Sequence, residues 1–486
     1  MYIKNNLTKE LRDKFITYSN NIFVIDSIND QKYTYSEFNI LVLKMCSFLE
    51  DIENFNGKKV CVITDNDFDT IVLYFALMYV GATAVPVNHK SEIKALEYFK
   101  NTLGIRYYFS KTSISNIQTI DYSYNKFSTY TIMKKEPFYD LGINDISIIM
   151  HSSGTTGKPK GIMQRISNLY NNALEFSEMV GIDQSNRFLN YLSLTYFGGY
   201  YNLMFLPFVN GASFVLSKQF NISMVTNLSK TIDKYEVNTL WLVPSIMSIM
   251  NRFDKSSKET LDIYRKKIKL SLVGTAPLSF KLKKEFKEKY NLVPLQNYGL
   301  SETFFISSQT KETIDLENTV GKILKSVEVS FDEDNEIIVK TPYLMNGYIV
   351  EDIESKNIIK NNTFKTGDIG YIENNMLYLT DRKKDIIIRG GENISPKEIE
   401  DVILNCEGVK EVAVIGLEHE LFGEDILAFI VTETIEDIKA KVKSFCSKNL
   451  GTKKIPSHVL MIKELPKNNS GKIDKNKLKT LCKELI

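Results

Sequence analysis

The sequence predicts an α/β fold, with a large N-terminal domain of layered α/β subdomains and a small α+β domain at the C-terminal end. Strand-like and helix-like runs alternate over residues 58–110, which is typical of parallel strands joined by helices. The charged segment DRKKD (381–385) separates a strand-like run from IIIRGGENIS. After it, SPKE (395–398) combines an N-cap serine, a first-turn proline and a capping-box glutamate. We therefore expect one domain over residues 1–381 and a second over residues 382–486.

The N-terminal elements follow from hydrophobic runs that are separated by turn residues. In chain order, we expect a strand at 58–66, a helix at 70–80, a strand at 82–88, a helix at 92–101 and a strand at 105–110. An apolar run at 146–150 predicts another buried strand, directly before a glycine-rich segment. In the C-terminal domain, the helix that starts at SPKE is expected to continue to Gly408.

The bulk composition argues against several classes of protein. The chain has 61 basic and 59 acidic residues, a net charge of +2, which gives no electrostatic basis for binding nucleic acid. Its five cysteines form no closely spaced pair and their number is odd. This favours a reducing compartment, the cytoplasm, over a disulfide framework or a thiolate metal site. Two long uncharged stretches, 70–87 and 188–217, contain helix-breaking residues. We interpret them as buried helix–strand pairs and expect no membrane span.

The segment HSSGTTGKPKG (151–161) has the chemistry of an anion-binding loop. Its glycines let backbone N–H groups approach an anion, its hydroxyls are donors and its lysines add charge. It is not the common nucleotide loop G-x-x-x-x-G-K-[ST], because proline follows the Gly-Lys pair. Taken alone, such a run also fits a flexible surface turn. The candidate anion ligands are Ser152, Ser153, Gly154, Thr155, Thr156, Gly157, Lys158 and Lys160.

Several familiar catalytic motifs are absent. His419-Glu420 begins an H-E-x-x-H zinc motif, but Gly423 stands where the second histidine is needed. The sequence contains neither G-x-S-x-G nor G-x-G-x-x-G, and it has only four histidines. We therefore expect chemistry that needs no catalytic triad.

Further segments accompany the 151–161 loop. They are LVGTAPLS (272–279), NYGLSET (297–303), FKTGDIGYI (364–372), DRKKDIIIRGGENISPKEIE (381–400) and NNSGKIDKNKL (468–478). Each alone fits an ordinary turn or an exposed charge. Together, and in this order, they resemble the adenylate-forming (AMP-binding) superfamily, which includes acyl-CoA synthetases, adenylation domains of nonribosomal peptide synthetases and luciferases. The resemblance runs from about residue 140 to the C-terminus.

The resemblance implies a reaction in which a carboxylate attacks the α-phosphate of ATP and releases pyrophosphate. Cations and oriented donors should offset the negative charge that meets at phosphorus. Catalytic roles are implied for Lys472, Glu302 and Thr155, with Glu302 as the Mg²⁺ ligand. The 152–160 loop would hold pyrophosphate. The remaining ATP-binding residues that the resemblance implies are Thr275, Ala276 and Pro277 with Tyr298 for adenine, Asp368 for ribose and Arg382 for the ribose-phosphate side.

A second half-reaction is implied, in which the acyl group passes from AMP to a thiol. The mixed anhydride is already activated, so no enzyme nucleophile is required. In the family the small C-terminal domain is mobile and rotates between the two steps. Lys384 matches the hinge position, and Gly390-Gly391 the loop that serves the second step.

The sequence supports two interpretations of the acyl acceptor. RGGENISPKEIE resembles acyl-CoA synthetases, which favours free coenzyme A. NNSGKIDKNKL resembles enzymes that load the phosphopantetheine of a separate carrier protein. The sequence is also compatible with an amine or hydroxyl acceptor, and with a non-catalytic scaffold that binds ATP.

The acid pocket is expected at SLTYFGGYYN (193–202), with Tyr196, Phe197 and Gly198. Tyr196 stands where many acyl-CoA ligases have histidine. Phe197 stands where relatives that activate amino acids have aspartate for the substrate ammonium. A buried ammonium without a partner is costly, so an otherwise uncharged aliphatic or aromatic carboxylic acid of open chain length is expected and an α-amino acid is disfavoured.

Overall fold

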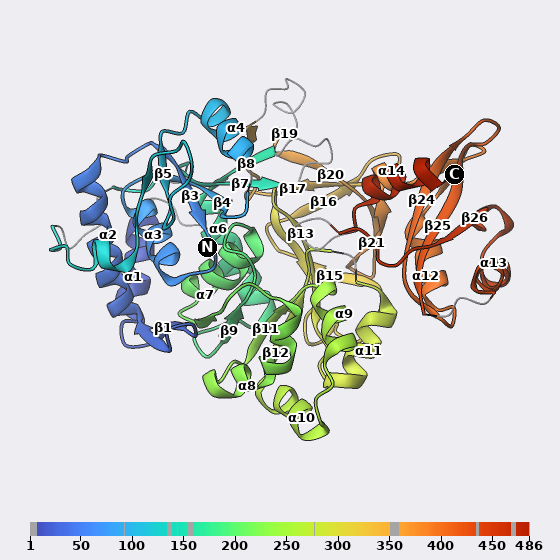
Figure 1. The fold of residues 1–486 in the computed structure, drawn as a ribbon, viewed down its shortest axis with the longest axis horizontal. Helices are drawn as coiled ribbons and strands as arrows, with labels where there is room; N and C mark the ends of the chain where they lie inside the picture. The colour runs from blue at the N-terminus through green and yellow to red at the C-terminus, as the bar shows by residue number, and fades with distance from the viewer. Residues whose placement is uncertain are drawn as a thin grey trace.

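A computed structural model describes residues 7–91, 93–133, 139–142, 144–152, 160–276, 278–349, 359–433, 437–467 and 473–485. Figure 1 shows a large body, which contains the blue, green and yellow parts of the chain, and a smaller orange-red lobe beside it. The predicted class, a large N-terminal α/β domain followed by a small C-terminal domain, is confirmed. The boundary at 381/382 stays a prediction.

The first sheet contains the strands predicted near the N-terminus. In spatial order its described strands are β18 (Tyr348–Ile349), β8 (Lys160–Arg165), β7 (Ile146–Ser152), β4 (Thr83–Asn88), β3 (Lys59–Thr64), β5 (Tyr107–Phe109) and β6 (Thr119–Ile120). Strands β7, β4, β3, β5 and β6 run parallel, as the alternation predicts. Strand β8 returns antiparallel to β7. This hairpin places both ends of the glycine-rich loop on neighbouring strands.

A second, larger sheet is parallel in one half and antiparallel in the other. In order it contains β16 (Glu328–Phe331), β17 (Glu336–Lys340), β20 (Thr363–Glu373), β21 (Met376–Arg382), β15 (Thr319–Ile323), β14 (Phe304–Ser308), β13 (Leu295–Leu300), β12 (Leu270–Val273), β11 (Thr239–Leu242), β9 (Arg187–Asn190), β10 (Ser213–Leu216), β1 (Ile22–Asp26) and β2 (Gln31–Thr34), with β19 (Ile359–Lys360) on β20. Strand β13 pairs in parallel with β12 and antiparallel with β14. The C-terminal end of β13 therefore lies where the strand pattern changes, a common place for ligand sites.

Helices cover both sheets and bury their apolar faces in shared cores. They are α1 (Leu7–Thr17), α2 (Tyr35–Ile52), α3 (Phe68–Tyr79), α4 (Ile93–Leu103), α5 (Tyr124–Phe127), α6 (Ile166–Val180), the π-helix η1 (Gly198–Phe205), α7 (Leu206–Val209), η2 (Ile222–Met224), α8 (Val225–Tyr235), α9 (Pro244–Phe253), α10 (Lys258–Lys267) and α11 (Phe280–Tyr290). Local signals fix their starts. The side chains of Thr34 and Glu37 form a reciprocal capping box at α2, and Asp67 caps α3. No helix in the described ranges is both long and apolar enough to cross a membrane.

The small lobe has its own sheet and its own core. Its elements are η4 (Lys383–Asp385), β22 (Ile387–Arg389), β23 (Glu392–Ile394), α12 (Pro396–Leu404), β24 (Val409–His419), β25 (Gly423–Thr432), α13 (Ile438–Asn449), η5 (Thr452–Lys454), β26 (His458–Met461) and α14 (Lys475–Leu485). Helix α12 begins as predicted, with the Oγ of Ser395 accepting from the backbone N–H of Glu398 at 3.2 Å. It ends at Leu404, four residues before the predicted end. Gly408, with φ +96°, lies in the turn that leads into β24.

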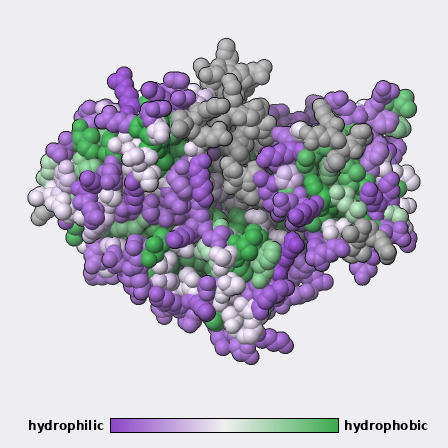
Figure 2. All heavy atoms as spheres, viewed as in Figure 1, coloured by the Kyte–Doolittle hydropathy of each residue, from purple (hydrophilic) through white to green (hydrophobic). Residues whose placement is uncertain are grey.

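The surface is polar and the cysteines lie inside. Figure 2 shows that polar side chains dominate the visible face of the molecule, with smaller apolar patches between them. All five cysteines are buried and none is in a disulfide. Their thiols are part of the apolar cores of the two domains.

Candidate active site

The base of the glycine-rich loop is a regular hairpin. His151 pairs with Gly161, and Ser152 pairs with Lys160. The backbone of Ser152 and the whole of Lys160 are described. The other expected loop ligands, Ser153, Gly154, Thr155, Thr156, Gly157 and Lys158, lie outside the described residues. The side chain of His151 packs on Phe99, with ring centroids 4.0 Å apart. Burial lowers the pKa of His151 to about 4, so the residue that precedes the loop is neutral at neutral pH.

Glu302 lies just beyond the end of β13, next to residues of the first sheet. The Tyr348 hydroxyl donates to Oε1 of Glu302 at 2.5 Å. The Nζ atom of Lys160 lies 5.3 Å from the ring centroid of Tyr348, a cation–π distance. The Nε2 of buried Gln164 also donates to the carbonyl of Ser301 at 2.6 Å. The structure thus brings the predicted metal ligand close to the base of the predicted anion loop.

Asp368 forms the centre of a buried polar cluster. It is 5% exposed. Its Oδ2 accepts from the Tyr298 hydroxyl at 2.7 Å, and its Oδ1 lies 2.6 Å from Nε of Arg382. The antiparallel register of β20 and β21 sets Asp368 opposite Arg382. Burial, and then the charge of Asp368, raise the pKa of Tyr298 well above its usual range. Tyr298 therefore stays a neutral donor that fixes the carboxylate.

The turn after β12 carries the predicted adenine segment. Gly274 has no room for a side chain, because an added Cβ would lie 2.2 Å from the Oδ1 of Asn297. Thr275 has φ +74°, a left-handed conformation that costs a β-branched residue about 1–2 kcal/mol. Ala276 follows within the described turn, and Pro277 lies outside the described residues. Burial raises the pKa of Tyr196, and the nearby side chain of Thr275 lowers it by less. The turn and the predicted acid pocket therefore lie next to each other.

The predicted acid-pocket segment leads into the π-helix η1. Phe197 is buried, and its ring meets Phe304 edge-on at 5.4 Å. Gly198 begins η1, and an added Cβ there would lie 2.6 Å from the Tyr196 ring. Phe197 therefore contributes apolar packing in the position where amino-acid-activating relatives would need a carboxylate.

The predicted hinge follows directly on Arg382. Lys384 lies in the short helix η4, and burial lowers its pKa. Its neighbour Lys383 is tied to the larger domain, with Nζ 2.7 Å from Asp334 and 3.1 Å from Glu336. Asp381 contacts the small lobe instead, because its Oδ2 accepts from the Ser395 hydroxyl at 2.6 Å. Two residues just before Lys384 thus hold different parts of the molecule, Asp381 the small lobe and Lys383 the larger domain.

Gly390 and Gly391 form the two-residue turn of the β22–β23 hairpin. Their φ values are +59° and +81°, as the common tight hairpin turns require. An ideal Cβ on either glycine would meet no heavy atom within 4 Å. The pair therefore presents an exposed, narrow backbone turn. Lys472 lies outside the described residues, three positions before the start of α14 at Lys475.

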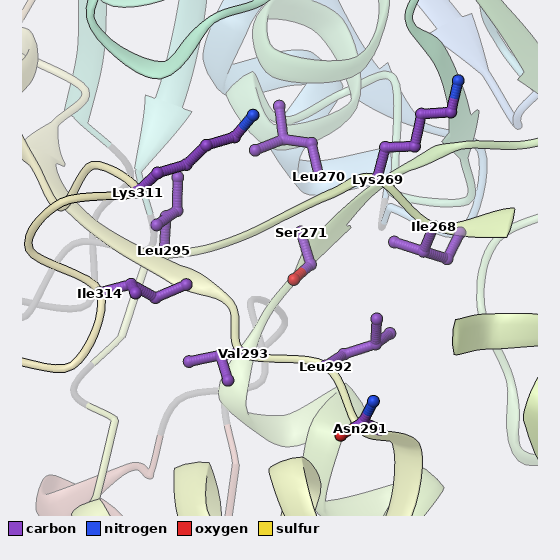
Figure 3. A pocket seen from close by; sticks show the side chains of 10 residues that line it. All are labelled: Ile268, Lys269, Leu270, Ser271, Asn291, Leu292, Val293, Leu295, Lys311 and Ile314. Carbon is purple, nitrogen blue, oxygen red and sulfur yellow. The ribbon is translucent and has the colours of Figure 1, made fainter. Parts of the chain in front are cut away.

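Sequence reasoning missed Tyr348 and Gln164, which belong to no spacing pattern. It quoted Asn297 only as part of NYGLSET (297–303) and gave it no role, so all three are recognised through their contacts. The described residues hold no group of three or more His, Cys, Asp or Glu side chains that could bind a metal ion. A pocket of about 120 Å³ lies at the opposite ends of β12 and β13 (Figure 3). Its lining comes from the first residues of these strands, from the segments that lead into them and from the segment after β14, so it lies apart from the candidate site.

Comparison with known proteins adds the following findings. The family model described as AMP-binding enzyme matches residues 12–349, and the model described as AMP-binding enzyme C-terminal domain matches residues 398–472. The chain is 28% identical over 449 residues to 2-succinylbenzoate–CoA ligase of Listeria monocytogenes, covering 92% of this chain and 94% of that protein. It is also similar to a solved structure, o-succinylbenzoate CoA synthetase (MenE) from Bacillus subtilis in complex with the acyl-adenylate intermediate OSB-AMP. The TM-score is 0.84 at 26% identity, with 98% of each chain covered. A further structure of that enzyme, with ATP and magnesium ion, has the same score and identity and covers 98% of this chain and 99% of that one.

Proposed function

Because the chain belongs to the AMP-binding enzyme family, we propose that it is an AMP-forming acid–thiol ligase. It activates a carboxylic acid with ATP, releases pyrophosphate, and transfers the acyl group from AMP to the thiol of coenzyme A. One observation carries the proposal most directly. The end of β13 contributes to two bonded clusters, one of Tyr298 and Arg382 on Asp368, the other of Tyr348 on Glu302, and the second cluster lies at the base of the glycine-rich loop.

In the first half-reaction, a carboxylate oxygen of the substrate bonds to the α-phosphorus while the bond to pyrophosphate breaks. Asp368 receives the ribose hydroxyls, and Arg382, which is held on Asp368 through Nε and Nη2, supplies positive charge on the ribose-phosphate side. The 152–160 loop donates hydrogen bonds to pyrophosphate as it leaves. Lys472 places a cation between the carboxylate and the α-phosphate.

Glu302 fits a magnesium ion by its chemistry. Mg²⁺ in nucleotide sites usually takes one or two carboxylates together with the substrate phosphates, and Glu302 offers such a carboxylate near the loop base. When bound, the ion neutralises charge on the leaving pyrophosphate.

In the second half-reaction, the sulfur of coenzyme A attacks the acyl carbon, the thiol proton is lost, and AMP leaves with the electron pair of the broken bond. The activated anhydride needs no enzyme nucleophile. Lys384 is the pivot that withdraws Lys472 and brings in the exposed Gly390-Gly391 turn for the second step. The different anchors of Asp381 and Lys383, which both directly precede Lys384, support a pivot in this short segment.

The acid is an otherwise uncharged aliphatic or aromatic carboxylic acid in preference to an α-amino acid. Buried Phe197, packed on Phe304, leaves that position without the carboxylate that an ammonium would require. The burial of the unpaired cysteines supports a cytoplasmic location. Loading of a separate carrier protein, which the NNSGKIDKNKL segment favours, is the second candidate.

The test is pyrophosphate release from MgATP with a panel of acids, with and without coenzyme A. The panel contains 2-succinylbenzoate, straight-chain and aromatic monocarboxylates, and α-amino acids. We expect release that depends on an acid and a turnover that rises with coenzyme A. Release that needs an acid but ignores coenzyme A would favour a carrier protein. Release with amino acids alone would refute the proposed acid class.

A further inference from the structure

Tyr348 connects two groups that the proposed function places around the phosphates of ATP. Its hydroxyl donates to Oε1 of Glu302 at 2.5 Å. The ammonium of Lys160 lies over its ring, 5.3 Å from the centroid. Glu302 follows β13 of the large sheet, whereas Lys160 begins β8 of the other sheet. A single side chain therefore links the carboxylate to the base of the loop.

The backbone around Tyr348 is fixed from both sides. Strand β18 pairs with β8, setting Tyr348 opposite Ile162. On the other side, the N–H of Met345 donates to the carbonyl of Glu302 at 2.7 Å. Between these, the N–H of Asn346 donates to the carbonyl of Met163 at 2.8 Å. The segment that carries Tyr348 is thus bonded through its backbone to β8 and to Glu302. The Tyr348 side chain contacts the same two parts of the chain.

The Tyr348 hydroxyl has the Glu302 carboxylate as its hydrogen-bond acceptor. This bond holds one carboxylate oxygen of Glu302 in a fixed direction. Among the described residues, the Tyr348 hydroxyl is the group that donates a hydrogen bond to the Glu302 carboxylate.

We propose that Tyr348 is a positioning residue, which fixes Oε1 of Glu302 so that Oε2 is presented to the magnesium ion. The inference rests on the proposed role of Glu302. Partners that orient a metal-binding side chain typically change metal affinity or activity by about 10- to 100-fold when removed. The tyrosine ring has a second effect, because it holds Lys160 at the loop base through the face of the ring, and this effect does not require the hydroxyl.

The test variant is Tyr348→Phe, which keeps the ring and removes the hydroxyl. The same segment provides a matched control, Tyr343→Phe. Tyr343 also donates to a glutamate, Glu175, but that glutamate lies in α6 and accepts from the backbone of Ser326. Both variants lose one tyrosine–glutamate hydrogen bond, and only one of these bonds reaches the candidate site.

The primary measurement is direct binding of Mn²⁺ in the presence of a non-hydrolysable ATP analogue, followed by the loss of the free Mn²⁺ electron paramagnetic resonance signal. We expect Tyr348→Phe to weaken Mn²⁺ binding about 10-fold or more, and Tyr343→Phe to bind as the wild type does. Equal Mn²⁺ affinity in Tyr348→Phe and the wild type would overturn the inference. Equal weakening in both variants would overturn it too, since it would reveal a general loss of packing.

A second readout separates positioning from general damage. Transfer of the acyl group from pre-formed acyl-AMP to coenzyme A begins after pyrophosphate has left, so Tyr348→Phe should retain its wild-type rate there. A parallel loss in both half-reactions would contradict a positioning role.

Glu302→Gln distinguishes a failure of this inference from a failure of the proposed function. If Glu302→Gln binds Mn²⁺ as tightly as the wild type, the metal role of Glu302 itself is wrong. If Glu302→Gln weakens binding and Tyr348→Phe does not, only the positioning role is wrong. We expect the double variant to be no weaker than Glu302→Gln alone, because the tyrosine acts through the carboxylate.

Discussion

The buried imidazole of His151 makes the stability of the N-terminal domain dependent on pH. The ring lies against Phe99, and its Nδ1 has no hydrogen-bond partner among the described residues. Burial lowers the pKa from 6.5 to about 4 in the folded protein. As the pH falls, the unfolded chain therefore takes up the proton first. Stability from this group is fully present above pH 6.5 and is lost as the pH falls towards 4.

The magnitude follows from the two pKa values. Between pH 7 and pH 5, this group becomes almost fully protonated in the unfolded chain and stays mostly neutral in the folded protein, which lowers the free energy of unfolding by about 2 kcal/mol. His151→Phe removes the titration and keeps a ring against Phe99. We expect the wild type to lose about 2 kcal/mol more than the variant over this pH interval.

Trp241 provides the assay. It is the single tryptophan of the chain, and it is fully buried in the same core as Ile148 and Met150 of β7. Urea unfolding followed by its fluorescence, at pH 7 and pH 5, gives the four free energies that the comparison needs. Other titrating groups cancel between the two proteins. Parallel pH dependence of the wild type and His151→Phe would refute the reasoning.

Three further predictions concern catalysis. Lys472→Ala should abolish formation of the adenylate and leave transfer from pre-formed acyl-AMP intact, as measured by separate assays of the two half-reactions; an equal fall in both would contradict the role of the lysine. Lys384→Pro should stiffen the hinge and slow the second half-reaction more than the first, and equal losses would argue against rotation at this residue. Tyr298→Phe removes a hydrogen bond to the Asp368 carboxylate, worth about 1.5–3 kcal/mol, so the KM for ATP should rise by about 10-fold or more. An unchanged KM would mean that Arg382 alone orients the carboxylate.

Much of the fold could be predicted because local signals agree with the tertiary structure. The strands expected at 58–66, 82–88 and 105–110 are present as β3, β4 and β5, and the helix expected at 70–80 is α3. The predicted end of α12 is wrong. The amphipathic pattern continues past Leu404 through Cys406, but the chain has already left the helix to approach β24. A periodic pattern of apolar residues indicates which residues are buried. A buried turn can continue this pattern without helical hydrogen bonds.

The candidate site was less accessible to sequence reasoning. The order of motifs along the chain pointed to Asp368 and Arg382 as site residues. Their pairing, however, depends on the register between β20 and β21, and no sequence spacing predicts that register. Tyr348 lies 46 positions from Glu302 and joins it only because β18 pairs with β8. The π-helix η1 was also unexpected, since two glycines and tightly packed aromatic residues give no helical signal. Contacts made across sheets carry information that a one-dimensional pattern lacks.

The burial of all five cysteines makes the native protein suitable for fluorescent labelling. Burial raises the pKa of thiols such as Cys46 and Cys61, so the reactive thiolate is scarce and dye reagents have little access to them. Leu421 at the tip of the small lobe is 83% exposed, and Ile16 in α1 of the large domain is 60% exposed. Donor and acceptor dyes on Leu421→Cys and Ile16→Cys would therefore follow the distance between the two domains during turnover, with every native cysteine left in place.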